Sequence, residues 1–227
     1  MNVDDVPVVR PSHKRLRGVW RWCFPVLVAV VPVILSACVW KPEIVTADPS
    51  FTSSELVAGK NAVMPVKFDN DKAIPAERAK MAGGLLRAIV QLRSDIPSLT
   101  NPAHTRAIQG SIDDEAVFLR AYDYDEKTGD PKSLESFRES LGARYLILSR
   151  LHYEQQVAGT GQSMGHSTVE STLSGTVSIL DTNTGKTVWA GTFSSTRGGV
   201  DTLVDPRPSA HALPFFSTFV KEWPGGS

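Results

Sequence analysis

A serine with the spacing of a nucleophile stands in the segment 161–165, Gly-Gln-Ser-Met-Gly, which matches the G-x-S-x-G pattern of serine hydrolases. In those enzymes the glycines permit a strained strand-to-helix turn that presents the serine. His211 and the acids Asp181, Asp201 and Asp205 follow Ser163 in a usable order. No helix pattern begins after Gly165, however, and the chain up to His211 is too short for a doubly wound sheet. The pattern therefore favours a flexible hairpin loop over a catalytic site.

Metal binding is the second kind of chemistry that the residue types suggest. The segment Asp123–Gly129 alternates acidic residues like a calcium loop, but Lys127 occupies the third ligand position and the glycine comes one place late. A solvated turn is predicted there, and turn capping at 69–71. The histidines at 13, 104, 152, 166 and 211 lack the spacing of a zinc site. Neither a metal nor a cofactor is expected, and no phosphate-binding glycine loop is present.

The overall composition is that of a globular protein. The chain has 227 residues, of which 41% are hydrophobic and 21% charged, and its formal net charge is zero. These values exclude a mainly disordered chain and a polytopic membrane protein. A nucleic-acid partner is not expected either, because the sequence after residue 21 shows no concentrated basic surface.

Residues 1–37 are predicted to be a signal peptide. Basic residues at positions 10, 14, 15, 17 and 21 precede an apolar run over 24–37. The run contains Pro25 and Pro32 and is shorter than the roughly 20 apolar residues that a membrane-spanning helix needs. A permanent transmembrane anchor is therefore not predicted.

The segment Leu35–Cys38, Leu-Ser-Ala-Cys, resembles the lipobox of bacterial lipoproteins. This resemblance implies cleavage before Cys38 and acylation of that cysteine, which gives stable anchoring because several acyl chains hold where one does not. Val39 in place of aspartate implies sorting to the outer membrane, facing the periplasm. The alternatives are an ordinary secretory signal with Cys38 as a spare thiol, and a buried helix that only looks like a signal. Cys23 leaves with the signal, so the mature domain has no free thiol for a disulfide or a zinc site.

The mature chain is predicted to consist of a tether and one domain. Residues 38–59, the lipidated cysteine and a Pro/Thr/Ser/Asp-rich stretch, have no helical or strand period and are expected to be flexible, spanning at most about 70 Å. Residues 60–227 are predicted to form the globular domain.

The predicted elements alternate between strands and helices. Strands are expected over 61–70, 105–109, 143–153, 169–181 and 187–196, and helices over 75–93, 113–122, 131–141 and 211–223, with a hairpin turn over 181–186. Gly142 should end the third helix, and Gly83 and Gly84 should let the first helix pack closely on the sheet. This order predicts an α+β fold with one mixed, largely antiparallel sheet and helices packed mainly on one face. The aromatic stripe of the last helix, from Phe215 to Trp223, should pack on that sheet; the alternative is a partner-binding face.

Three segments together resemble one superfamily of envelope proteins. They are VMPVKFDN, LGARYLILSRL and LSGTVSILDTNTGKTVWAGTF, within about residues 61–196. The superfamily includes the TolB amino-terminal domain, the curli secretion lipoprotein, PelC and LpoB. The first segment departs from the pattern because two residues separate Pro65 from Phe68. Trp189 matches the aromatic that follows the hairpin turn, which implies core packing.

The resemblance implies a non-enzymatic adaptor or accessory of an envelope machine for cell-wall synthesis, secretion or polysaccharide export. The alternative is a ring-forming structural subunit of a secretion or export channel. An enzyme would rest on Ser163 alone. The expected partners are the membrane, through lipid on Cys38, and either an envelope protein or further copies of the chain.

Overall fold

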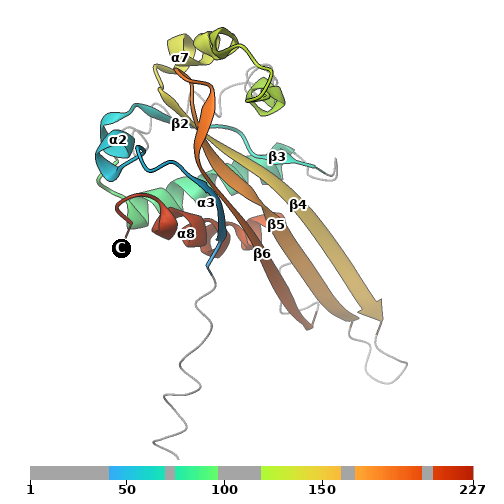
Figure 1. Ribbon diagram of the computed structural model, residues 1–227. Helices are drawn as coiled ribbons and strands as arrows, with labels where there is room; N and C mark the ends of the chain where they lie inside the picture. Colours follow the sequence, from blue (N-terminus) through green and yellow to red (C-terminus); the bar gives the residue numbers. More distant parts are fainter. Residues whose placement is uncertain (1–40, 70–74, 97–118, 160–166, 201–206, 227) are drawn as a thin grey trace, which may run out of the picture. The chain divides into compact units, whose positions relative to one another are not determined.

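Six strands form one mixed sheet in the computed structural model, which describes residues 41–69, 75–96, 119–159, 167–200 and 207–226 (Figure 1). The strands are β1 (Glu43–Ala47), β2 (Asn61–Val63), β3 (Lys67–Phe68), β4 (Tyr145–Gly159), β5 (Ser167–Asp181) and β6 (Lys186–Val200). Their order is β1-β6-β5-β4-β2, and β3 also pairs with β4. Only β2 and β3 run parallel to β4, while the other pairs are antiparallel. The predicted α+β class with a largely antiparallel sheet is confirmed.

Two helices, α3 (Pro75–Leu92) and α8 (Ala212–Glu222), cover one face of the sheet (Figure 1). The predicted alternation of β5 is confirmed, because Leu173, Val177 and Ile179 are buried in the core beneath these helices. The aromatic stripe of α8 packs on its own sheet: Phe215, Phe216, Phe219, Val220 and Trp223 are all buried. Trp189 lies in the same core, edge-on to Phe219 and Trp223.

The contact between α3 and α8 depends on one of the two helix glycines. A Cβ atom on Gly84 would overlap the Cβ atom of Ala212, whereas a Cβ atom on Gly83 would meet nothing within 4 Å. The close approach that the sequence predicted for both glycines therefore holds for Gly84. Within the described residues, no helix is both long and apolar enough to cross a membrane.

Among the described residues, the opposite face of the sheet is covered at one end only. The 3-10 helices η1 (Arg120–Asp123) and η2 (Pro131–Leu134) and the helix α7 (Glu135–Leu141) enclose a second, smaller core there. Gly142 ends α7 in the left-handed conformation, with φ of 60°, as predicted. The remainder of this face carries the hydroxyl side chains of β5 and β6, such as Thr172, which bonds to Thr196 at 3.0 Å.

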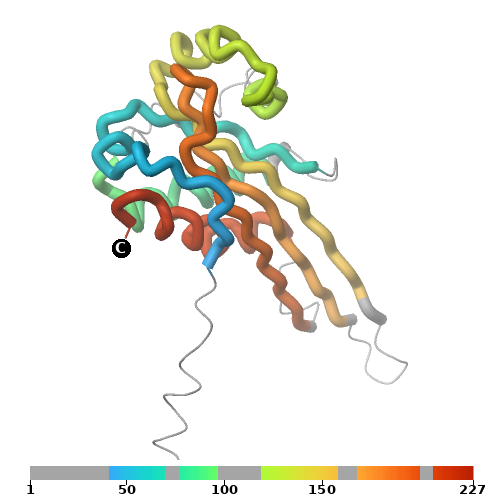
Figure 2. The backbone as a smooth tube through the Cα atoms, viewed as in Figure 1, coloured from blue at the N-terminus to red at the C-terminus, as the bar shows by residue number. Residues whose placement is uncertain are grey.

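The tether predicted over residues 38–59 is wrong for the part that the structure describes. β1 pairs with β6, and the helix α2 (Ser53–Ala58) follows it. Phe51 and Leu56 are buried, and the ring centroid of Phe51 lies 5.1 Å from that of Tyr145. A five-residue edge strand needs no strong period of its own, because the neighbouring strand supplies its hydrogen bonds. Within the described residues, folded structure is thus present from Lys41 onward, and one compact unit extends from there (Figure 2).

The remaining predicted elements differ mainly in their bounds. β4, β5 and β6 each extend to 15 residues. The helix predicted over 131–141 begins as 3-10 turns. The strand expected over 105–109 and most of the helix expected over 113–122 lie outside the described residues, as do the predicted signal peptide and Cys38.

The predicted first strand divides into β2 and β3, and a tyrosine fills the interval. Between them no described strand pairs with Ser149 on the outer side of β4, whereas β5 pairs with it on the other side. The Tyr122 hydroxyl accepts the Ser149 N–H at 2.8 Å and donates to the Pro65 carbonyl at 2.7 Å. Burial raises the pKa of the Tyr122 phenol well above its ordinary value, so the hydroxyl stays protonated and can donate. One side chain therefore replaces the missing backbone pairing.

Replacing Tyr122 by phenylalanine should lower the free energy of unfolding by about 2 kcal/mol, because it leaves buried backbone groups of Ser149 and Pro65 without their partner. Urea unfolding of the mature domain measures the loss. Tyr124→Phe is the matched control, since the Tyr124 hydroxyl makes only a 3.3 Å bond to the Gly129 carbonyl; its effect should stay within about 0.5 kcal/mol. Equal losses in the two variants would contradict the bridging role.

Candidate interaction surface

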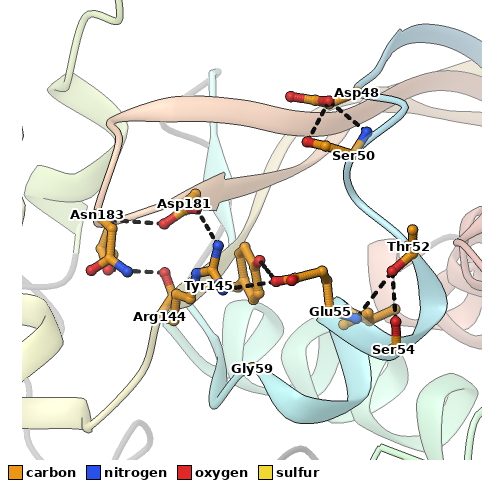
Figure 3. A network of polar contacts seen from close by, with 12 residues as sticks. Asp48, Ser50, Thr52, Ser54, Glu55, Gly59, Arg144, Tyr145, Asp181 and Asn183 are labelled. Atoms are coloured by element: carbon orange, nitrogen blue, oxygen red, sulfur yellow. Dashed lines mark hydrogen bonds and ion pairs between the residues drawn. The ribbon is translucent and has the colours of Figure 1, made fainter.

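A polar network joins α2, the start of β4 and the end of β5 (Figure 3). Arg144 lies at its centre, immediately before β4. Its Nη1 donates to Glu55 Oε2 of α2 at 2.7 Å, and its Nη2 donates to Asp181 Oδ2 at 3.1 Å. The Asp181 side chain is 4% exposed, whereas the other two side chains are about two-fifths exposed. The guanidinium therefore neutralises one buried carboxylate and one surface carboxylate at the same time.

Tyr145 completes this network. Its hydroxyl donates to Glu55 Oε2 at 3.0 Å, and the Arg144 guanidinium lies over its ring, 4.8 Å from the centroid. Burial, together with the bond to the Glu55 carboxylate, raises the pKa of the Tyr145 phenol. A Cβ atom on Gly59 would collide with the same ring, so a glycine is needed there. Because the charged groups bond to one another, this network fixes α2 on the sheet and offers no group poised for catalysis.

The residues of the predicted serine motif are not brought together as a triad within the described structure. Ser163 and its glycines lie outside the described residues, but the flanking segments are β4 and β5, two strands of a hairpin. His211 is fully buried, and its Nε2 lies 2.8 Å from Ser171 Oγ. Asp181 stands ten places further along β5 than Ser171, about 33 Å away. The acids Asp201 and Asp205 also lie outside the described residues.

The acidic turn that resembled a calcium loop is closed by its own hydrogen bonds. Asp125 accepts from the backbone of Lys127 and from the Thr128 hydroxyl, both at 2.9 Å. Asp123 forms an ion pair with Lys67 at 3.0 Å. Backbone and side-chain hydrogen bonds lower the pKa of Asp125, in that order of importance. In the part of the chain that the structure describes, no three acidic, histidine or cysteine side chains are grouped to hold a metal ion.

A recess of about 290 Å³ opens on the partly covered face, between η1 and the strands. Its walls include Tyr122, Tyr124, Glu126, Arg150 and Thr176. Arg150 donates to the Tyr122 carbonyl at 2.9 Å, and Glu126 accepts the Thr187 N–H at 2.7 Å. The recess thus combines aromatic wall, cation, carboxylate and hydroxyl, a mixture suited to a polar side chain or a small polar ligand.

Two strand edges of the sheet lack partners among the described residues. β4 pairs on its outer side with β2 over 145–147 and with β3 over 150–151, and no described strand pairs with 154–159 on that side. β6 pairs with β1 through 189–192, and on that side no described strand pairs with 194–200. Unpaired N–H and C=O groups on such edges can accept a strand from another chain. Sequence analysis missed these edges because it ended both strands too early.

Exchange of one arginine tests the network. Arg144→Met should lower the free energy of unfolding by about 2 kcal/mol, because the buried Asp181 carboxylate loses the guanidinium and keeps the 2.8 Å bond from the Asn183 N–H. Chemical denaturation measures the loss. Arg138→Met removes an exposed ion pair with Glu135 and a 3.2 Å bond to Asn183 Oδ1, and it should cost less than about 1 kcal/mol. A smaller loss of unfolding free energy in Arg144→Met than in Arg138→Met would contradict the role of Arg144 in this network.

Comparison with known proteins finds likeness in structure only. No family model matches the chain, and no curated protein matches it. A PelC dodecamer from Paraburkholderia phytofirmans aligns with a TM-score of 0.35 and 16% identity, covering 70% of this chain and 86% of that one. A single-residue variant of that dodecamer gives 0.34 and 16%, covering 78% and 88%. A lipoprotein from Neisseria meningitidis gives 0.36 and 10%, covering 70% and 96%. None of these likenesses shows a family.

Proposed function

We propose that this protein is a lipoprotein, anchored by acyl chains on Cys38 to the outer membrane, that serves a periplasmic envelope machine as a non-enzymatic adaptor. The observation that carries the proposal is the segment Leu35–Cys38 at the end of an apolar run, followed at once by a folded domain. The machine would be one for cell-wall synthesis, secretion or polysaccharide export. Its partner is another envelope protein.

Two side chains that could serve catalysis instead make structural contacts, which supports the role of an adaptor. His211 bonds to Ser171 inside the core, and Asp181 is held by Arg144. The described surface has a recess on the partly covered face of the sheet and an edge of β4 without a strand partner. Both are features through which proteins bind peptide segments or strands.

Exchange of the two cysteines tests the anchor. In a diderm bacterium that expresses the full chain, Cys38→Ser should abolish incorporation of labelled palmitate and release the protein from the outer-membrane fraction. Cys23→Ser is the matched control, because this residue lies within the predicted signal peptide and should change neither result. Labelling that survives in Cys38→Ser, or a wild-type protein without label, would refute the lipoprotein assignment.

A ring-forming subunit is the second candidate, and the two unpaired edges favour it. β4 and β6 are both antiparallel to β5, so they run in the same direction. The free stretch of β6 in one copy can therefore add to that of β4 in the next copy as a parallel pair. Such head-to-tail contacts are heterologous and close into a ring when the rotation between copies permits it.

The mass of the mature chain in solution distinguishes the two candidates. Light scattering on residues 39–227 should give a single-chain mass for an adaptor and a discrete high-order mass for a ring. Val157→Lys places a charge on the free edge of β4, where Val157 is 60% exposed, and should dissociate a ring. Val90→Lys, at a 49% exposed position on α3, should leave it intact. A ring insensitive to Val157→Lys would exclude the β4 edge as its interface.

A further inference from the structure

The chain between the proposed anchor and the folded domain is very short. Cys38 and Lys41 are three residues apart, so their Cα atoms lie within about 10 Å of each other in any conformation. The inference that follows rests on the proposed acylation of Cys38. If that residue is held at the bilayer surface, the surface passes close to Lys41, and the whole domain must lie on one side of it.

The beginning of the domain is firmly held, so it cannot act as additional tether. Pro42 is buried, and Glu43 stands opposite Thr192 in the pairing of β1 with β6. The Lys41 ammonium lies 3.4 Å from the Glu222 carboxylate of α8. Beyond β1, the Asp48 N–H donates to the Val188 carbonyl at 2.9 Å. Residues 41–48 are therefore held on the sheet, so the position of the anchor restricts the position of the sheet.

β1 is the last strand in the order of the sheet, and it presents apolar side chains outward. Its register against β6 shifts between Ile44 and Thr46, so that Val45 has no residue opposite it. A bulge of this kind bends the strand and re-aims a side chain. Val45 is 62% exposed and Ile44 is 40% exposed. Two adjacent apolar side chains are therefore exposed on the strand that follows the proposed anchor first in the sequence.

We propose that the β1 edge of the sheet lies against the bilayer that carries the acyl chains, with Val45 in the headgroup region. Three observations agree on this surface: the length of chain before Lys41, the position of β1 at the end of the strand order, and the apolar side chains of Ile44 and Val45. Because the anchor holds the edge at high local concentration, a contact too weak to bind a free domain is sufficient.

This placement limits which partners the protein reaches. The β2 side of the sheet lies four strand positions from β1, about 19 Å away at the usual strand spacing. The unpaired edge of β4 is on that side and faces away from the bilayer. A partner bound there must itself lie near the same membrane, since the chain has no long tether with which to span the periplasm.

Single fluorescent probes on the acylated protein test the placement. The mature chain has no cysteine apart from Cys38, so Val45→Cys and Lys60→Cys each provide one labelling site. Lys60 is exposed and precedes β2, at the opposite end of the strand order. The labelled proteins are reconstituted into phosphatidylethanolamine–phosphatidylglycerol vesicles that contain a lipid with a nitroxide on its headgroup. The probe at 45 should be quenched several-fold more strongly than the probe at 60.

Two failures of this experiment are distinguishable. Mass spectrometry of the purified protein shows whether Cys38 carries acyl chains, and an unacylated protein would refute the lipoprotein proposal itself. An acylated protein whose two probes are quenched equally, or whose probe at 60 is quenched more, would overturn the placement of β1 while leaving the anchor intact. Both substitutions replace exposed side chains, so the fold is retained in each variant.

Discussion

Antiparallel pairing joins β4 to β5 without a bulge from the pair Tyr145–Asp181 to the pair Gly159–Ser167. A shift of one residue would turn Leu173, Val177 and Ile179 away from α3 and α8, so burial of that face holds the register. The same register brings Arg144, at the start of β4, beside Asp181. On the other side of β4, its pairing with β2 and β3 leaves an interval opposite Ser149, where the Tyr122 hydroxyl bonds to the backbone. The polar network and the covered face thus depend on one alignment.

Short-range patterns in the sequence were sufficient for the elements that carry their own period. The alternation over β5, the amphipathic spacing of α3 and the glycine at 142 each predicted a structure that is present. The short elements before β2 were not predictable in this way. β1 is only five residues long, and its stability comes from β6, some 150 residues later in the chain. Glu55 and Arg144 are likewise 89 residues apart, so their ion pair has no local signature.

The functional residues differ in the same way: some belong to a local sequence pattern, and others are brought together only by the fold. Lipid anchoring at Cys38 is a property of four consecutive residues, and it was the strongest prediction from sequence, although it remains a prediction. The recess at Arg150 draws its walls from η1, β4, β5 and β6, and no spacing in the sequence joins them. The unpaired edge of β4 depends on where β3 ends, which is a property of the three-dimensional pairing. Sequence could therefore indicate where the protein resides, but it could not indicate which surface a partner meets.

Replacement of the tether by folded structure changes what kind of adaptor this chain can be. A flexible tether over 38–59 would let the domain search across the periplasm, and its orientation would carry no information. In the proposed arrangement, a sheet that begins five residues after the acylated Cys38 has its orientation restricted by the membrane itself. β1 and the β4 edge lie at different positions across one sheet. If the membrane fixes the position of β1, it therefore also sets the direction in which the β4 edge faces. Binding to a partner on the same membrane would then cost less orientational entropy, which is how a modest edge contact becomes sufficient.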